Sequence, residues 1–390
     1  MLKYVSIDKE LVLSICVMTD NDRNSDIYLN SLQLIAKYGY TPQQHTVITK
    51  DGYLVTLYRI PRSGPPVLLV HGIGDSSDSW VVLGPAKSTA FLLSDSGYDV
   101  WLFNARGNKY SKGHINNLAK KLYWDFSYEE MGTQDLPAVV DHILSTTNEQ
   151  KLSYIGFSQG TTIFMVMCST KPEYNEKIKE AILLAPVATI TYTKYSFIDI
   201  VSQNLDLVSS FLDGIGVYDL FSDKALNNLY HAQVCRDGVP EQVLCALEFF
   251  ISYGIRNISN LLPERLPVLA SHIPAGVSTK TFVHYVQSYI SRKFQKFDDG
   301  PVTNRIKYSS SKPPVYDLSL IKVPLYMFVS ESDWFSTIED VEQLRRKLSS
   351  VVQYVVYNKS LDFTHLEFVY GSRINAFVNE PVINILSRYR

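Results

Sequence analysis

Short apolar runs recur along the chain, and longer stretches with helical spacing separate most of them. The runs lie at residues 65–72, 97–107, 152–155, 181–188, 323–330 and 351–357. Apolar runs of this length predict strands that are buried on both faces. Alternation around Asp51 and Gly52 predicts a β-hairpin over residues 46–59. Because the buried strands alternate with helical stretches such as residues 131–144, the pattern predicts an α/β fold with a mostly parallel sheet flanked by helices.

The rhythm changes after residue 187, where apolar residues follow helical spacing with Pro and Gly breaks, as in FIDIVSQNLDLVSSFLDGIGVYDLF. A mainly helical insertion fits this pattern better than a continuation of the sheet. Its apolar faces pack either on the core or over a pocket as a cap, and the pattern leaves both interpretations open. The predicted units are an N-terminal segment (1–25), a first core part (26–186), a helical cap or lid insertion (187–307) and a second core part (308–390).

Composition and charge exclude several classes of protein. The chain has 390 residues, 46% of them hydrophobic, with 37 Lys and Arg against 39 Asp and Glu. This balance, without a block of five like charges, argues against nucleic-acid binding. The sequence has no run of roughly 18 apolar residues and no metal- or nucleotide-binding motif. We therefore expect a globular protein with no metal, cofactor, nucleic-acid partner or transmembrane segment, and of unknown oligomeric state.

A serine between two glycines lies where a predicted strand meets a predicted helix. The sequence YIGFSQGTT places Ser158 between the apolar run that ends at Ile155 and the apolar stretch TTIFMVMC. Such a corner brings backbone close to both sides of the serine, so Gly156 and Gly160 would avoid Cβ clashes. This pattern is typical of the nucleophile elbow of α/β-hydrolases, although about one random chain in ten of this composition would contain it. The surrounding sequence must therefore show whether Ser158 is a nucleophile or the pattern arose by chance.

A nucleophilic serine needs a histidine base and an acid that orients the base, and in α/β-hydrolases the chain order is serine, acid, histidine. The acid is expected just past a late strand, where VPLYMFVSESDW offers Glu331 and Asp333. The chain has eight histidines, which are His45, His71, His114, His142, His231, His272, His284 and His365. Only His365 follows either acid, so this fold requires His365 as the base.

The oxyanion of the transition state needs hydrogen-bond donors. In this fold one donor is the backbone N–H of the residue after the nucleophile, here Gln159, and the other comes from a loop after an earlier strand. VLLVHGIGDSSDSW supplies that loop, and we assign the second donor to Ile73, directly after His71 and Gly72. One such donor typically lowers the barrier by about 3 kcal/mol.

Many segments of the chain resemble a known family. They include YGYTPQQHTVITKDGYLVTLYRIP, HGIGDSSDSW, GYDVWLFNARGNKYSKGH, WDFSYEEMGTQDLPAVVDHIL, YIGFSQGTT, LLAPVA, FQKFDDGPVTNRIKYSSSKPPVYDLS and SDWFSTIEDVEQL. Together they resemble the acid lipases, which include gastric and lysosomal acid lipases and many insect lipases. The resemblance implies an α/β-hydrolase fold with an inserted cap whose lid covers the acyl site. It also implies Ser158 as nucleophile, Asp333 as acid and His365 as base, with Ile73 and Gln159 for the oxyanion hole.

The same resemblance bears on covalent links and on location. VCRDGVPEQVLC resembles the family's disulfide loop and so implies a Cys235–Cys245 bond, whereas the spacing alone also allows two buried thiols. Asn257 and Asn358 lie in glycosylation sequons. Members of the family are secreted or lysosomal, and we expect the same location here, although Leu11–Met18 is a degenerate signal-peptide candidate.

Three residues depart from the family pattern. Phe157 stands before the nucleophile where His is usual, so any pH tuning by that imidazole is absent. Gly74 stands where Leu is common, which would loosen the mouth of the acyl pocket. Ser330 ends the strand before the acid where Gly is common. These changes bear on substrate and pH range more than on activity.

The residues and the resemblance lead us to expect a serine ester hydrolase of the acid-lipase type. Its substrate would be a fatty acyl ester of a neutral lipid, triacylglycerol or cholesteryl ester, at an oil–water or membrane interface. Ser158 would attack the ester carbonyl, and water would then hydrolyse the acyl-enzyme. Two alternatives stay open: a carboxylesterase for smaller or specialised esters, and a non-catalytic lipid-binding protein of the same fold.

Overall fold

A central sheet has the strand order β1-β2-β4-β3-β6-β7-β10-β11, and the short β5 pairs with β2 off this path. The strands are β1 (Gln43–Ile48), β2 (Tyr53–Ile60), β3 (Pro66–Val70), β4 (Asp99–Phe103), β5 (Gly113–His114), β6 (Leu152–Phe157), β7 (Ile178–Leu184), β10 (Leu325–Ser330) and β11 (Val351–Tyr357). β1, β2 and β4 pair antiparallel, and every pair from β4 to β11 is parallel. The predicted hairpin and the mostly parallel sheet are therefore confirmed.

The computed structural model describes residues 25–221, 234–236, 244–245 and 254–390. The signal-peptide candidate Leu11–Met18 lies outside the described residues, as does nearly all of the predicted N-terminal segment 1–25.

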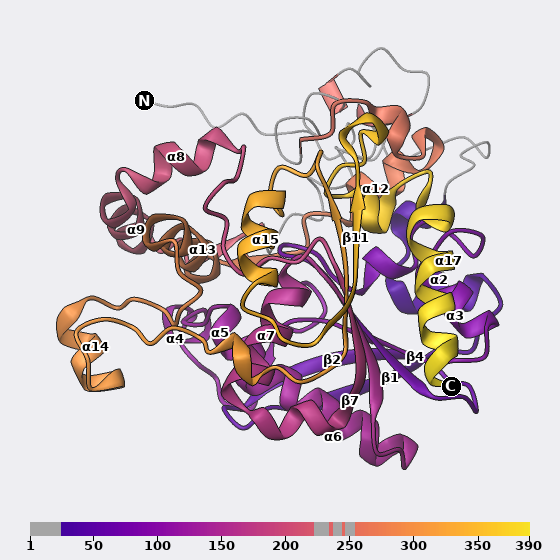
Figure 1. The fold of residues 1–390 in the computed structure, drawn as a ribbon, viewed down its shortest axis with the longest axis horizontal. Coiled ribbons are helices and arrows are strands. Elements are labelled where there is room, and N and C mark those ends of the chain that lie inside the picture. The colour runs from indigo at the N-terminus through magenta and orange to yellow at the C-terminus, as the bar shows by residue number, and fades with distance from the viewer. Residues whose placement is uncertain (1–24, 222–233, 237–243, 246–253) are drawn as a thin grey trace, which may run out of the picture.

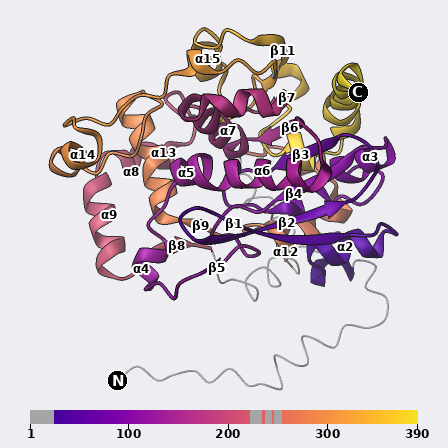
Figure 2. The ribbon, with the colours of Figure 1, turned by 90° about the horizontal axis from the view of Figure 1, so that it is seen from below.

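Helices cover both faces of the sheet (Figures 1 and 2). Those of the two core parts are α2 (Ser31–Lys37), α3 (Thr89–Asp95), α4 (Lys120–Tyr123), α5 (Tyr128–Glu130), α6 (Leu136–Thr147), α7 (Gln159–Thr170), α15 (Ile338–Arg345), α16 (Glu367–Tyr370) and α17 (Glu380–Leu386). Because side chains alternate across a strand, each central strand feeds two separate apolar cores. Leu68 and Val70 of β3 join α6 and α7 in one core, and Val67 and Leu69 join α2, α3 and α17 in the other.

The stretch between β7 and β10 is mainly helical in its described residues, as predicted. Its elements are α8 (Ser196–Ser202), α9 (Leu205–Gly214), β8 (Asp219–Leu220), α12 (Leu266–His272), β9 (Val277–Ser278), α13 (Thr279–Ser291) and α14 (Pro301–Tyr308). In both ribbon views α8, α9, α13 and α14 gather on one side of the sheet (Figures 1 and 2). Ile198, Val201 and Val286 are buried in the core that holds α7, so one face of these helices packs on the body of the protein. The unit boundaries at 187 and 307 stay a prediction.

The helix predicted over residues 131–144 begins differently from expectation. Residues Met131–Asp135 form a π-helical turn between α5 and α6. A Cβ on Gly132 would lie 2.6 Å from the Cβ of Val166 in α7, so this turn presses directly on the helix that follows Ser158. Such a contact between distant segments is invisible to periodicity, which reports only one segment at a time.

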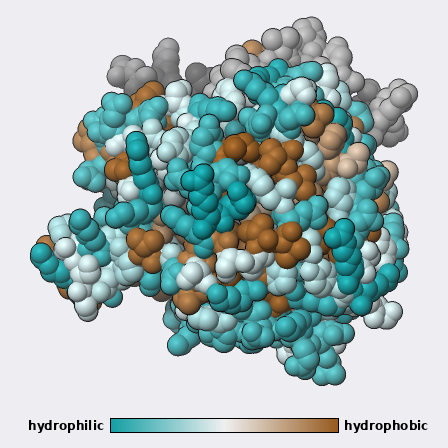
Figure 3. All heavy atoms as spheres, viewed as in Figure 1, coloured by the Kyte–Doolittle hydropathy of each residue, from teal (hydrophilic) through white to brown (hydrophobic). Residues whose placement is uncertain are grey.

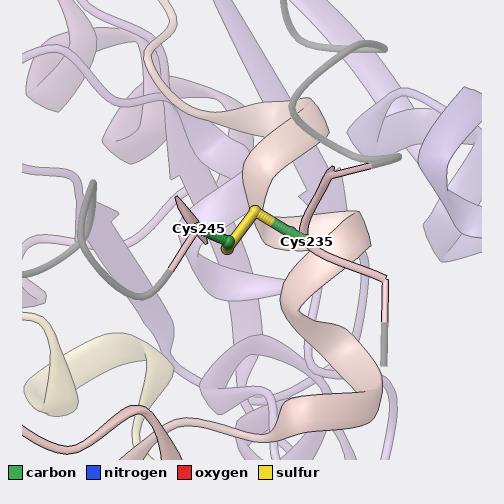
Figure 4. Close-up of a disulfide and its surroundings, with 2 residues drawn as sticks. All are labelled: Cys235 and Cys245. Atoms are coloured by element: carbon green, nitrogen blue, oxygen red, sulfur yellow. A yellow bond between two sulfur atoms is a disulfide. The ribbon is translucent and has the colours of Figure 1, made fainter. Parts of the chain in front are cut away.

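The structure contains the disulfide that the resemblance implied. Cys235 and Cys245 are both buried, their Cα atoms are 5.0 Å apart, and their sulfurs are bonded (Figure 4). Both cysteines belong to the apolar core that also contains residues of α12. Cys168 is a buried free thiol.

Candidate active site

Ser158 lies at the corner between β6 and α7 in a strained conformation. Its φ is 51° and its ψ is −115°, a region that L-residues rarely occupy. A Cβ on Gly160 would lie 2.4 Å from the carbonyl oxygen of Val70, and one on Gly156 would lie 2.8 Å from the backbone of Gly160. Neither position therefore has room for a side chain, which is the physical reason for glycine at both places.

Three side chains from distant parts of the chain meet at this corner. Nε2 of His365 is 2.9 Å from Oγ of Ser158, and Nδ1 of His365 is 2.7 Å from Oδ2 of Asp333. All three side chains are buried. Ser158 comes from the β6–α7 corner, Asp333 from the loop after β10 and His365 from the segment between β11 and α16. A base within hydrogen-bond reach of a hydroxyl, itself oriented by an acid, is the arrangement that activates a serine.

The surroundings separate the two candidate acids. Oδ1 of Asp333 accepts hydrogen bonds from the backbone amides of Phe335 at 2.8 Å and Ser336 at 2.9 Å, which leaves Oδ2 for His365. Glu331 is exposed, and its Oε2 accepts a hydrogen bond from the backbone amide of Lys359 at 2.6 Å. Only Asp333 therefore meets the imidazole.

The loop after β3 passes directly beside the serine. A Cβ on Gly72 would lie 3.3 Å from the Cβ of Ser158 and 3.0 Å from the ring of Phe157. Ile73 follows in this loop, and Gln159 is the first residue of α7. These two residues thus lie on the chain segments that adjoin Ser158, and their assignment to the oxyanion hole stays a prediction.

The imidazole of His71 holds this loop in one arrangement. The backbone amide of Ala105 donates to Nε2 at 3.1 Å, so the proton resides on Nδ1, which donates to the carbonyl oxygen of Gly72 at 2.7 Å. Complete burial lowers the pKa of His71 to about 4, so the ring stays neutral near pH 7. A neutral ring with one fixed tautomer can accept on one side and donate on the other.

Asparagines that follow β4 extend this support. Oδ1 of Asn104 accepts a hydrogen bond from the backbone amide of Ser77 at 2.9 Å, and Nδ2 of Asn108 donates to Oδ1 of Asn104 at 3.2 Å. Sequence analysis did not identify this support, because a buried amide that braces another loop leaves no periodic or spacing signal.

The three departures from the family pattern have different local surroundings. The ring of Phe157 lies 5.0 Å from the imidazole of His365, and the ring of Phe335 lies 5.2 Å from it. Gly74 has a φ of +66° and open space beside its Cα, so leucine there would be strained. Oγ of Ser330 accepts from the backbone amide of Ser332 at 3.2 Å, which supports the turn that carries Asp333.

A cavity of about 380 Å³ lies elsewhere, between α4, α9 and α13. It has no triad residue in its lining. Nζ of Lys280 lies 2.7 Å from Oδ1 of Asp125, and Nζ of Lys121 lies 2.7 Å from Oδ1 of Asp213. The charges of both lysines are thus paired with carboxylates of the same lining.

Two family models match the chain. A model described as the alpha/beta hydrolase fold covers residues 65–369, and one described as a partial alpha/beta-hydrolase lipase region covers residues 32–84. Naproxen esterase (carboxylesterase NP) from Bacillus subtilis superposes with a TM-score of 0.52 at 15% identity, over 95% of this chain and 99% of that one. At that identity the superposition supports the fold alone.

Curated relatives match over most of their length. Lipase 1 of Drosophila melanogaster is 37% identical over 93% of this chain and 81% of its own length. Gastric triacylglycerol lipase of Bos taurus is 35% identical over 95% of this chain and 94% of its own length. With the sheet order, the strained serine corner and these matches, the chain belongs to the acid lipase family of the α/β-hydrolase fold.

Proposed function

We propose that this protein is a serine ester hydrolase that cleaves fatty acyl esters of neutral lipids. The observation that carries the proposal is the hydrogen-bonded series from Ser158 through His365 to Asp333 at a strained strand–helix corner. The relatives are named as lipases, and one of them as a triacylglycerol lipase, which supports a triacylglycerol substrate.

The geometry supports a two-step reaction. His365 takes the hydroxyl proton of Ser158 as Oγ attacks the ester carbonyl, and it returns that proton to the departing alcohol. Water, deprotonated by the same imidazole, then cleaves the acyl-enzyme and releases the fatty acid. Asp333 holds the ring with Nε2 toward the serine and stabilises the imidazolium that forms in each step.

Backbone amides would stabilise the oxyanion in both steps. We assign this role to Ile73 and Gln159, because the loop after β3 and the start of α7 adjoin Ser158. His71 would keep the first of these amides in place through its hydrogen bond to Gly72.

An apolar surface on the insertion fits a substrate that is itself an interface. The side chains of α8, α9 and the residue after α9 that remain exposed include Phe197, Ile200, Leu207, Phe211 and Ile215. Figure 3 shows apolar surface among hydrophilic side chains over this region. Surface of this kind fits adsorption to a lipid droplet or bilayer. In the part of the chain that the structure describes, no helix is long and apolar enough to cross a membrane.

We also propose that the protein is secreted or lysosomal. The Cys235–Cys245 bond suits an oxidising compartment. Asn257 and Asn358, the two candidate glycosylation residues, are exposed in the structure. If the protein purified from its native source migrates faster on a gel after enzymatic deglycosylation, this would support passage through the secretory route. If neither sequon carries a glycan, this support would be lost.

The decisive experiment compares three substrates across pH for the wild type and Ser158→Ala. The substrates are emulsified long-chain triacylglycerol, cholesteryl ester and a soluble short-chain ester. We expect release of fatty acid from an emulsion and a loss of about 10⁴-fold or more in the variant. Turnover of the soluble ester alone would identify a carboxylesterase. If Ser158 were required for the cleavage of none of the three substrates, the protein would instead be a lipid-binding protein.

A further inference from the structure

A buried hydrogen bond connects two segments that both carry active-site residues. The phenol hydroxyl of Tyr370 donates to Oδ2 of Asp75 at 2.6 Å, and it lies 3.3 Å from Oγ of Ser79. Oδ1 of Asp75 accepts a hydrogen bond from the backbone amide of Ser76 at 2.7 Å. Tyr370 is fully buried and Asp75 nearly so, and they are separated by 295 residues in the chain.

On one side of this bond lies the loop that passes Ser158. Asp75 is two residues after Ile73, the proposed oxyanion donor. The carbonyl oxygen of Gly74, between them, accepts a hydrogen bond from the backbone amide of Ala275 at 2.7 Å. Displacement of Asp75 would therefore be transmitted over two residues to the amide of Ile73.

On the other side lies the segment that carries His365. The backbone amide of Tyr370 donates to the carbonyl oxygen of Leu366 at 2.8 Å, and that of Glu367 donates to Thr364 at 3.1 Å. Oε1 of Glu367 also accepts from the backbone amide of Thr364 at 2.8 Å. His365 thus lies inside a continuous hydrogen-bonded segment that ends at Tyr370.

We propose that Tyr370 and Asp75 form a positioning pair. Their hydrogen bond holds the loop after β3, which carries Ile73, in a fixed position relative to the segment that carries His365. This inference rests on the proposed function. The pair touches neither the nucleophile nor the substrate carbonyl; it acts through the two segments. The base and the oxyanion donors must act on the same ester group, so the distance between them has to stay fixed during the reaction. The Tyr370–Asp75 hydrogen bond connects the two segments that carry these groups.

The electrostatic surroundings suit a strong hydrogen bond. The pKa of Asp75 is raised to about 6, chiefly by burial and to a smaller extent by the nearby carboxylate of Asp78, although hydrogen bonds from Tyr370, Ser79 and the backbone of Ser76 oppose the rise. Asp78 in turn is paired with Lys109 and with Nδ1 of His272. Above pH 6 the bond from Tyr370 is therefore a charge-assisted bond in a dry environment, which is stronger than a neutral one.

Tyr370→Phe removes the hydroxyl and keeps the buried ring. Tyr389→Phe is the control, because it also removes a hydrogen-bonded phenol hydroxyl, the one that lies 2.8 Å from the hydroxyl of Tyr326, and this bond involves neither the loop after β3 nor the segment that carries His365. We would measure kcat and KM on a soluble short-chain ester at pH 7.5. Hydrogen exchange of the peptides that cover residues 72–79 and 364–371 would be followed in the same proteins.

We expect Tyr370→Phe to lower kcat by about tenfold with KM changed less than about twofold, and to speed exchange in both peptides together. The control should change neither. A normal kcat in Tyr370→Phe beside an active wild type, or faster exchange in only one peptide, would overturn the pair. Absence of serine-dependent turnover in the wild type would instead overturn the proposed function, and this inference with it.

Discussion

Asp333 and Glu331 are two residues apart, yet their carboxylates differ in their surroundings. Two backbone amides point at Oδ1 of Asp333, so its second oxygen is aimed at the Nδ1–H of His365. Glu331 accepts from the amide of Lys359 at the surface. The role of the acid therefore depends on fixed hydrogen bonds around the carboxylate and not on the presence of a carboxylate near the strand end.

Asp333→Asn should lower kcat by about 10⁴-fold with little effect on KM. The amide is isosteric, but it does not hold the tautomer of His365 that presents an unprotonated Nε2 to Ser158, and it does not stabilise the imidazolium. Steady-state kinetics on a soluble ester measures the effect. Glu331→Gln is the matched control and should stay within about twofold of the wild type; equal losses in both variants would refute the assignment.

The positions of the three side chains were predictable because each follows from a chain-order rule. A serine at a glycine-flanked corner, an acid past a late strand and a histidine after that acid leave few choices in this sequence. The bond between Tyr370 and Asp75 was not predictable, because two residues 295 positions apart share no local pattern. The roles of the triad and of the two oxyanion donors stay predictions until activity is measured.

At the scale of elements, the amphipathic helices of the insertion expose an apolar stripe. Leu207, Phe211 and Ile215 are spaced by four residues and lie on one face of the α9 segment. Leu207 is 70% exposed and Phe211 is 63% exposed, although Leu205 of the same helix is buried. Because these large apolar side chains are exposed and not packed in the core, we expect this face of α9 to contact a lipid surface.

A Leu207→Ser/Phe211→Ser double variant should lose at least about tenfold of its activity on emulsified triacylglycerol, because less apolar area would be buried at the interface. Activity on a soluble ester should stay within about twofold, since neither residue contacts the triad. Val352→Ser on β11 is the control, because Val352 is similarly exposed on an edge strand. Equal losses on both kinds of substrate would assign the stripe to folding and not to the interface.

Long buried strands and amphipathic helices were predictable from periodicity, whereas small elements were not. β3, β6 and β10 are mostly apolar and are buried along their whole length. β5, β8 and β9 have two residues each, too few to show a period, and they exist because a neighbouring strand offers a partner. The π-helical turn at residues Met131–Asp135 likewise depends on the contact with α7.

For the molecule as a whole, two buried histidines couple folding to pH. Burial lowers the pKa of His71 to about 4 and that of His284 to about 3. In the unfolded chain both would titrate near their ordinary value of about 6.5. Between these values the unfolded state binds more protons than the folded state, so the free energy of unfolding falls as the pH decreases from about 6.5 toward 4. Asp75 acts in the opposite direction, since its raised pKa makes protonation stabilising as the pH decreases below about 6.

His284 allows this coupling to be tested away from the triad. Its Nε2 donates to the carbonyl oxygen of Gln295 at 2.9 Å, and its Nδ1 accepts from the hydroxyl of Ser127 at 3.0 Å. In His284→Gln the amide can form similar hydrogen bonds and does not titrate. The free energy of unfolding, measured in urea at each pH, should therefore fall less steeply in the variant between pH 6 and 4, by up to about 1.4 kcal/mol per pH unit. Above pH 7.5 the two proteins should show parallel curves, because the histidine is neutral in both states. If the curves stay parallel down to pH 4, the buried imidazole does not resist protonation, and the acid sensitivity of the fold must come from other groups.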